Sequence, residues 1–267
     1  MRLLILASPY DAVAADVATR VRAAGDPVTM VALEDLGRAR WDHRLGGGAV
    51  ATRLTLTDGL AVDAGAHDAV LNRLRYEPTL LFTRMQAEDR AYARAEFHAL
   101  LLSWLASIDG RMVGRPAPPG LAGPQVGAWQ WLQAATAAGF VPYPARATSS
   151  ARLAPPGAGD QPWAALLPHA FHPALDMLGI DRPRAYAPAA VDGLRLTLIG
   201  GQAVEAVDPA LAACGARLAK AMGTDILQLE LARSAADDRW RFVGAEPMPV
   251  VLDPPAIDAL VALVRRR

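Results

Sequence analysis

Lysine is almost absent from this chain of 267 residues. Lys220 is the only one among 27 basic side chains, so the other 26 are arginines. Cysteine is also limited to one residue, Cys214, which cannot form an internal disulfide. A lone thiol in an Ala-rich helical stretch is typical of a small buried side chain. A chain without disulfides suits a reducing compartment, so we expect a cytoplasmic protein.

The chain also lacks an excess of charge and long apolar runs. Its 27 basic and 27 acidic side chains cancel, so no overall positive field attracts nucleic acid or an anionic membrane. No run approaches the roughly 18 apolar residues that a membrane span needs. The apolar run at the start is too short for a secretory signal. We therefore expect neither a nucleic-acid partner nor a membrane partner.

What the chain does contain is enough apolar material for a substantial core. Hydrophobic residues make up 52% of it, and its length suits one large domain or a few small ones. Residues 2–8 predict a strand, 13–24 a helix and 28–33 a second strand. A strand, a helix and a strand in this order favour a parallel pair, so the pattern predicts an α/β fold.

Two segments break the regular pattern. The Pro/Gly-rich residues 114–124 are expected to have no regular structure, and 145–190, with repeated prolines, predict a linker or a loosely packed insertion. The other expected elements are a hairpin-like excursion at 41–62, a strand at 69–74, a helix at 88–108, a short strand at 112–113, a helix at 126–138, a strand or turn at 140–144, a hairpin of 194–199 with 203–207, a helix at 209–221, strands at 225–232 and 240–243, and a helix at 255–266.

The order of motifs resembles the ATP-grasp superfamily, in particular the carboxylate-amine ligases related to ribosomal protein S6 modification enzymes. In the first half the likeness lies in ValLeuAsnArgLeu at 70–74, AspArgAlaTyrAlaArgAlaGlu at 89–96, GlyArgPro at 114–116 and AlaGlyPheValProTyrPro at 138–144. The last part is more specific, with AspGlyLeuArgLeuThrLeuIleGlyGlyGlnAlaValGluAla at 192–206, GlyThrAspIleLeuGlnLeuGluLeu at 223–231 and ArgPheValGlyAlaGluProMetPro at 241–249.

The resemblance spans most of the chain and implies an ATP-grasp-like α/β (α+β) architecture. It implies a pre-ATP-grasp α/β domain at 1–115 and a reduced, Pro/Gly-rich central lobe at 116–190. The ATP-grasp C-terminal sheet and helices would occupy 191–267.

The resemblance also implies metal ligands on two adjacent antiparallel strands. Mg²⁺ ions that bridge nucleotide phosphates need oxygen ligands held at short range. By position, Glu230 matches the first metal carboxylate and Glu246 the usual asparagine, whereas Gly244 stands at the second carboxylate and offers no ligand. Glu230 and Glu246 therefore either bind one Mg²⁺ or are ordinary surface or hydrogen-bonded carboxylates.

Three arginines are candidates for contact with an anionic substrate. Arg195 matches a family position that holds the acyl-phosphate or the substrate carboxylate, which implies a catalytic role; alternatively it pairs with Glu205 across the hairpin. Arg73 and Arg75 follow a strand that would end at the interdomain crevice, where ligands of α/β folds bind. Each of these two is otherwise a plain surface arginine.

The nucleotide side of the family site is poorly represented. The family neutralises ATP phosphates with two lysines, yet 125–190 contains none, and Lys220 suits the end of a helix. Arginine differs from lysine in size and shape and is no simple replacement. Neither a Walker-type motif, nor a dinucleotide fingerprint, nor a nucleophile elbow is present. His169 and His172 share one helical face without a metal-site context.

These observations favour a degenerate relative that no longer ligates and instead binds a partner protein, a peptide or a small-molecule carboxylate in a biosynthetic pathway. The alternative is an active carboxylate-amine ligase that uses ATP and Mg²⁺. A third hypothesis is an obligate subunit that contributes Arg195 or its N-terminal domain to a site on another chain. The family often forms homo-oligomers, although this sequence has no direct sign of one.

Overall fold

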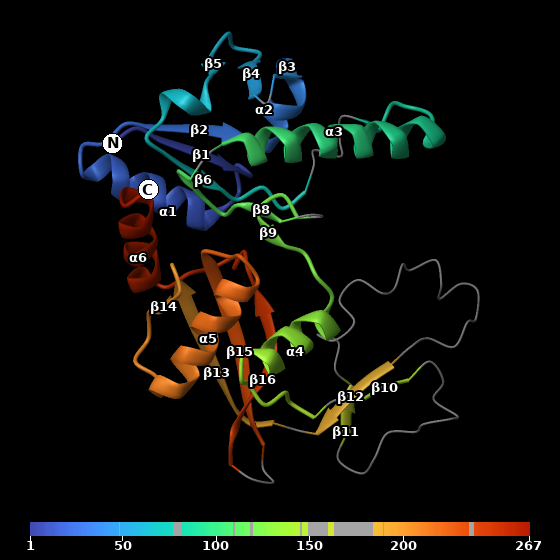
Figure 1. Cartoon of the computed structure of the whole chain (residues 1–267), viewed down its shortest axis with the longest axis vertical. Coiled ribbons are helices and arrows are strands. Elements are labelled where there is room, and N and C mark those ends of the chain that lie inside the picture. Colours follow the sequence, from blue (N-terminus) through green and yellow to red (C-terminus); the bar gives the residue numbers. More distant parts are fainter. Residues whose placement is uncertain are drawn as a thin grey trace. The chain divides into compact units, whose positions relative to one another are not determined.

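The computed structural model divides into two compact units. Unit 1 comprises Met1–Gln125, Gly223–Ile226 and Pro247–Arg267, and unit 2 comprises Val126–Met222 and Leu227–Glu246. The C-terminal segment thus belongs with the N-terminal part of the chain, unlike the boundaries expected from the sequence. The structure describes residues 1–47, 49–76, 82–108, 110–117, 120–144, 146–148, 160–162, 184–188, 190–234 and 238–267 (Figure 1).

A parallel four-stranded sheet forms the centre of unit 1. Its strands, in spatial order, are β2 (Val28–Ala32), β1 (Leu3–Ala7), β6 (Ala69–Asn72) and β7 (Met112–Val113). All neighbouring pairs are parallel, which confirms the α/β prediction. The chain leaves β1 for β2 on one side and later returns to β6 on the other. The carboxyl ends of β1 and β6 therefore flank a topological switch point, where ligands of such sheets bind.

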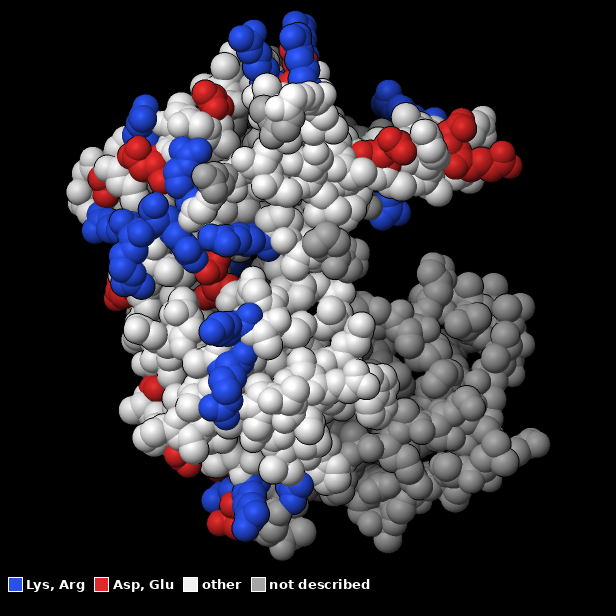
Figure 2. Space-filling model, in the orientation of Figure 1, with Lys and Arg blue, Asp and Glu red and all other residues white. Residues whose placement is uncertain are grey.

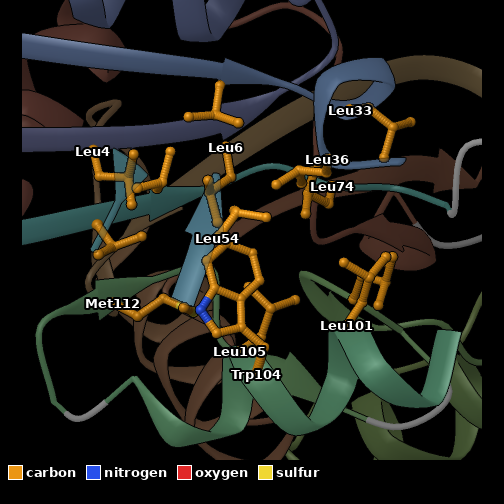
Figure 3. Close-up of a cluster of buried hydrophobic side chains, with 14 of the residues drawn as sticks. Leu4, Leu6, Leu33, Leu36, Leu54, Leu74, Leu101, Trp104, Leu105 and Met112 are labelled. Carbon is orange, nitrogen blue, oxygen red and sulfur yellow. The ribbon is translucent and has the colours of Figure 1, made fainter. Parts of the chain in front are cut away.

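Helices cover both faces of this sheet. On one face α1 (Ala12–Ala23) packs against β1 and α6 (Pro254–Arg265) against β6 and β7, and the two helices contact each other. On the other face Leu4 and Leu6 meet Trp104 and Leu105 of α3 (Ala87–Ser107), with Leu54 completing the core (Figure 3). Helix α2 (Leu33–Arg38) was not predicted, because six residues are too few to show a helical period.

The excursion after α2 is a small antiparallel sheet, as predicted. Its strands are β3 (Arg40–Gly46), β4 (Ala49–Thr55) and β5 (Ala61–Val62), in that spatial order. Trp41 of β3 packs edge to face on Trp104 and Phe97, with ring centroids 5.2 and 6.1 Å apart. These aromatic contacts attach the small sheet to α3.

The expectation that 114–124 has no regular structure is wrong. Its ends form β8 (Pro116–Ala117) and β9 (Gly123–Pro124), which pair in parallel. The cause is a buried amide rather than a local pattern. Nδ2 of Asn72, at the end of β6, donates to the carbonyl oxygens of Gly114 at 2.9 Å and Leu121 at 2.7 Å.

Unit 2 is built on a second four-stranded sheet. Its spatial order is β14 (Gln202–Ala203), β13 (Ala190–Ile199), β15 (Ile226–Ser234) and β16 (Trp240–Glu246). Helices α4 (Ala128–Ala137) and α5 (Pro209–Ala221) pack on one face through a shared core that includes Trp131 and Cys214. The predicted helices and the strands at 225–232 and 240–243 are confirmed, and the hairpin forms, although its second strand is Gln202–Ala203 and not 203–207. Lys220 lies in the last turn of α5. Trp129 is 43% exposed, whereas Trp131 is buried.

The segment between α4 and β13 is more regular than expected where the structure describes it. Phe242 donates to the carbonyl of Val141 at 2.8 Å and accepts from Tyr143 at 2.7 Å, so the predicted strand or turn is a single bridge. The expected linker contains a three-stranded antiparallel sheet, in the order β10 (Arg146–Thr148), β12 (Arg184–Pro188), β11 (Asp160–Pro162). His169 and His172 lie outside the described residues. Among the described helices, none combines the length and the apolar character of a membrane span.

Gly114 provides a test of this architecture. It adopts a φ of +81°, and a Cβ built there would lie 2.2 Å from the backbone oxygen of Asn72. We expect Gly114→Ala to lower the free energy of unfolding by about 3 kcal/mol, because strain and overlap act together. Gly110→Ala is the matched control, since its Cβ meets nothing within 4 Å. Equal stability of the two variants in urea unfolding would contradict the close approach.

Candidate functional site

Arg73 is part of the interior of unit 1. It follows β6, its side chain is 1% exposed, and its Nε donates to Asp11 Oδ1 at 3.0 Å and Oδ2 at 2.8 Å. Asp11 begins α1, where its Oδ1 also accepts from the backbone N–H of Ala14 at 2.9 Å. One carboxylate therefore caps a helix and neutralises a buried guanidinium.

Both predicted arginines of unit 1 also hold the chain that follows β16. Nη2 of Arg73 donates to the carbonyl of Pro249 at 2.8 Å, and Nη2 of Arg75 donates to the carbonyl of Met248. The backbone oxygen of Arg75 accepts from Gln125 at 2.6 Å. Arg73 is thus not a plain surface arginine, and its contact with a substrate stays a prediction.

A small pocket lies beside these arginines, at the carboxyl ends of β1 and β6. Its volume is about 120 Å³, and its walls include Asp11, Arg73 and Arg75. Tyr10 and Tyr76 also line it, and they are 91% and 55% exposed. Ligand pockets usually measure about 300 to 1,000 Å³, so this one suits a single small group such as a carboxylate.

The metal positions predicted from the sequence share the polar face of the unit 2 sheet. In the antiparallel pair β15–β16, Glu230 lies opposite Gly244, and Gln228 lies opposite Glu246. Leu229 and Leu231 alternate with them and belong to the core, so the two glutamates point away from the helices. Both are exposed. As diagonal neighbours they stand about 7 to 8 Å apart, within reach of long side chains.

Gly244 leaves a gap between these carboxylates. A Cβ built at Gly244 meets nothing within 4 Å, so the position is open and yet provides no ligand. Among the described residues, no three His, Cys, Asp or Glu side chains form a group that could hold a metal ion. The residues present therefore do not fit the full carboxylate set that the resemblance implies.

Arg195 reaches the polar face from β13. Its neighbours Leu194 and Leu196 pack with the core, so the exposed Arg195 side chain points the other way. Within the described chain, no hydrogen bond or ion pair engages its guanidinium. Glu205, the alternative partner, accepts instead from the backbone N–H of Thr197, through Oε2 at 2.8 Å. The predicted catalytic role of Arg195 stays a prediction.

Arg241 and Tyr143 also lie near this face, and neither was predicted from the sequence as a site residue. Arg241 of β16 pairs in register with Ala232, two residues beyond Glu230. Tyr143 packs against Ala232, and burial raises the pKa of its phenol above the usual value, an effect that the charge of Arg241 partly opposes. A period of two that runs back from Glu246 and Gly244 leads to the buried Phe242 and would have missed Arg241, which reaches this face only because the register shifts beside Glu230. Tyr143 is brought there by long-range packing.

Comparison with solved structures decides the fold. The macrocyclase MdnC from Microcystis aeruginosa, bound with the precursor peptide MdnA, superposes with a TM-score of 0.76 at 16% identity, over 100% of both chains. A RiPP-associated ATP-grasp ligase of Chryseobacterium gregarium, in complex with ADP and a leader and core peptide, gives 0.70 at 12% identity, over 99% of this chain and 96% of the other. The chain has the ATP-grasp fold.

A third structure agrees. The ATP-grasp ligase PsnB, complexed with a minimal precursor, Mg and ADP, has a TM-score of 0.72 at 16% identity, over 99% of this chain and 98% of its own. No protein-family model and no curated protein matches the sequence. The ATP-grasp fold expected from the motifs is therefore confirmed by structure, at an identity too low to transfer an activity.

Removing Arg73 should destabilise this ATP-grasp fold. We expect Arg73→Met to lower the free energy of unfolding by about 3 to 5 kcal/mol, because Asp11 would be left almost buried without its partner. Asp11→Asn keeps an oxygen that can cap α1 and removes the charge. The double variant should therefore recover part of the loss. Urea unfolding of the two single variants and the double variant measures this, and additive losses would contradict the coupling.

Restoring a carboxylate at Gly244 tests whether the polar face can converge on a metal ion. Gly244→Asp places three carboxylates on that face, and we expect it to bind Mn²⁺ at least tenfold more tightly than Gly244→Ala. The alanine variant is matched because it adds the same Cβ without an oxygen. Electron paramagnetic resonance of free Mn²⁺ measures both, and equal affinity would show that Glu230 and Glu246 do not act with position 244.

Proposed function

We propose that this protein binds a peptide in a biosynthetic pathway and does not itself form the bond that ATP-grasp ligases form. The observation that carries the second part is the polar face of the unit 2 sheet, where Gly244 interrupts the row of metal carboxylates. The single lysine supports it, because Lys220 lies in α5 and leaves the rest of the chain without one. The peptide part is supported by the three superposed ligases, each of which has a precursor or a leader and core peptide bound.

Each unit offers a cationic group that suits a peptide carboxylate. In unit 2, Arg195 presents an exposed guanidinium. In unit 1, the pocket beside Arg75 has room for one small anionic group, with the exposed rings of Tyr10 and Tyr76 on its walls. Guanidinium groups bind carboxylates with two parallel hydrogen bonds, which makes arginine well suited to this task.

The second candidate is an active carboxylate-amine ligase that uses ATP and Mg²⁺. It is favoured by one observation: Glu230, Glu246 and Arg195 all lie on the same face of one sheet. In such an enzyme Glu230 and Glu246 would be the carboxylate ligands of a single ion. The side chain missing at Gly244 and the lack of lysines place this candidate second.

Titration with ATP separates the two. We expect no saturable heat when the protein is titrated calorimetrically with ATP up to millimolar concentration, with or without Mg²⁺, and no rise in the melting temperature. The physical reason is that nothing in the described residues replaces the missing carboxylate and lysines. Saturable binding that requires Mg²⁺ and is lost in Glu230→Gln would instead establish the ligase candidate. Because Glu230→Gln retains the shape of the side chain, a loss of binding in this variant would reflect the missing charge and not a failure to fold.

A further inference from the structure

Among the residues that the structure describes, no strand pairs with most of one edge of the small sheet in unit 1. β4 pairs with β3 along its whole length, from Arg40 opposite Thr55 to Gly46 opposite Ala49. On its other side β4 pairs with β5 only at Leu54 and Thr55. The chain then turns away from β4 into the short 3-10 helix Ala64–Ala66. Within the described ranges, the rest of β4 therefore has no partner on this edge.

The hydrogen-bond pattern identifies the backbone groups at this edge. The backbone N–H of Leu56 donates to the carbonyl of Leu60 at 2.9 Å, so the backbone N–H and C=O of Leu56 point toward the β5 side. In an extended strand the backbone groups of alternate residues point to the same side, so the N–H and C=O groups of Thr52 and Val50 also point to the β5 side. No hydrogen bond to the backbone N–H or C=O of these two residues occurs in the part of the chain that the structure describes. Such unpaired groups form a template for another strand.

A cavity of about 560 Å³ lies beside this edge, within the range of ligand pockets. Its walls are residues 50–55 of β4, the segment 61–65, and Trp104 and Ile108 at the end of α3. Val50 at its rim is 40% exposed. The cavity thus combines the open strand edge with apolar side chains, as a groove for an extended peptide requires.

The charges at the cavity favour an acidic partner. Arg53 is exposed, and Arg111 is held in place by donating to the carbonyls of Gly65 at 3.2 Å and His67 at 2.8 Å. The one carboxylate in the lining, Asp63, accepts from the backbone N–H of Gly65 at 2.7 Å. Figure 2 shows further basic side chains, together with acidic atoms, in the part of unit 1 where Figure 1 places β3 and β4.

We propose that an acidic peptide binds here in extended conformation, as a strand added to β4. Its backbone pairs with Val50 and Thr52 in continuation of β5, its apolar side chains enter the cavity toward Trp104 and Ile108, and its carboxylates meet Arg53 and Arg111. Because this surface belongs to unit 1 and uses none of the residues at the nucleotide and metal positions, the proposal is independent of whether the protein ligates.

The test uses two fluorescein-labelled hexapeptides, one alternating valine with glutamate and one alternating valine with lysine. We expect fluorescence anisotropy to give at least tenfold tighter binding of the glutamate peptide to the intact protein. Val50→Pro removes the edge N–H, whereas Val50→Ala shortens the same side chain and keeps it. We expect Val50→Pro to bind at least tenfold more weakly than Val50→Ala. Circular dichroism checks that both variants fold.

A charge reversal provides a second readout that does not depend on the proline variant. Arg53 is exposed, so Arg53→Glu should fold and should now prefer the lysine peptide. Equal affinity of the two peptides for the unaltered protein, or equal binding by Val50→Pro and Val50→Ala, would overturn the proposal. Loss of binding in Arg195→Ala would also overturn it, because the peptide would then occupy the polar face of unit 2.

Discussion

The buried ion pair between Arg73 and Asp11 is the contact on which the architecture of unit 1 depends most. It joins the end of β6 to the start of α1, and the same guanidinium holds the chain at Pro249, so three distant segments meet at one side chain. Removing two charges from water is costly, and the pair offsets this cost because both carboxylate oxygens of Asp11, and Nε and Nη2 of Arg73, are hydrogen-bonded. At the switch point of the sheet, Arg73 and Arg75 therefore mainly bind the backbone of the C-terminal segment. Only the small pocket beside them is left for a ligand.

How far the sequence predicts this structure depends on whether the cause is local. The helix at 209–221 was predicted with correct bounds because its start is encoded locally, by Asp208 as the capping residue and Pro209 in the first turn. The order in 114–124 was missed because it comes from Asn72, far away along the chain. Likewise nothing near Arg73 indicates burial, since its partner Asp11 is 62 residues away.

The candidate site likewise has features with a local cause, which the sequence predicts, and features that depend on long-range contacts, which it does not. Alternation along β15 is enough to predict that Glu230 faces away from the core, and position 244 can be assigned from the motif that contains it. The pairing of Gly244 with Glu230 could not be predicted, because the register shifts between Glu230 and Leu231 and such irregularities leave no reliable pattern. The alternative in which Glu205 pairs with Arg195 rests on a pattern of the same kind. A carboxylate opposite an arginine suggests an ion pair, yet Glu205 accepts from the backbone N–H of Thr197.

The two faces of the unit 2 sheet separate the side chains that stabilise the fold from those at the predicted metal positions. The stability of the unit resides in the leucines that face α4 and α5, and these are unaffected by what the opposite face carries. On that opposite face Glu230 and Glu246 already place two negative charges near each other. Without a metal ion, a third carboxylate between them would add repulsion, and like charges side by side on a sheet are destabilising. Glycine at 244 removes that repulsion at no cost in packing, since its position is open. If the protein holds no metal ion, as the proposed function requires, glycine at position 244 is therefore the residue that the electrostatics of the sheet favours.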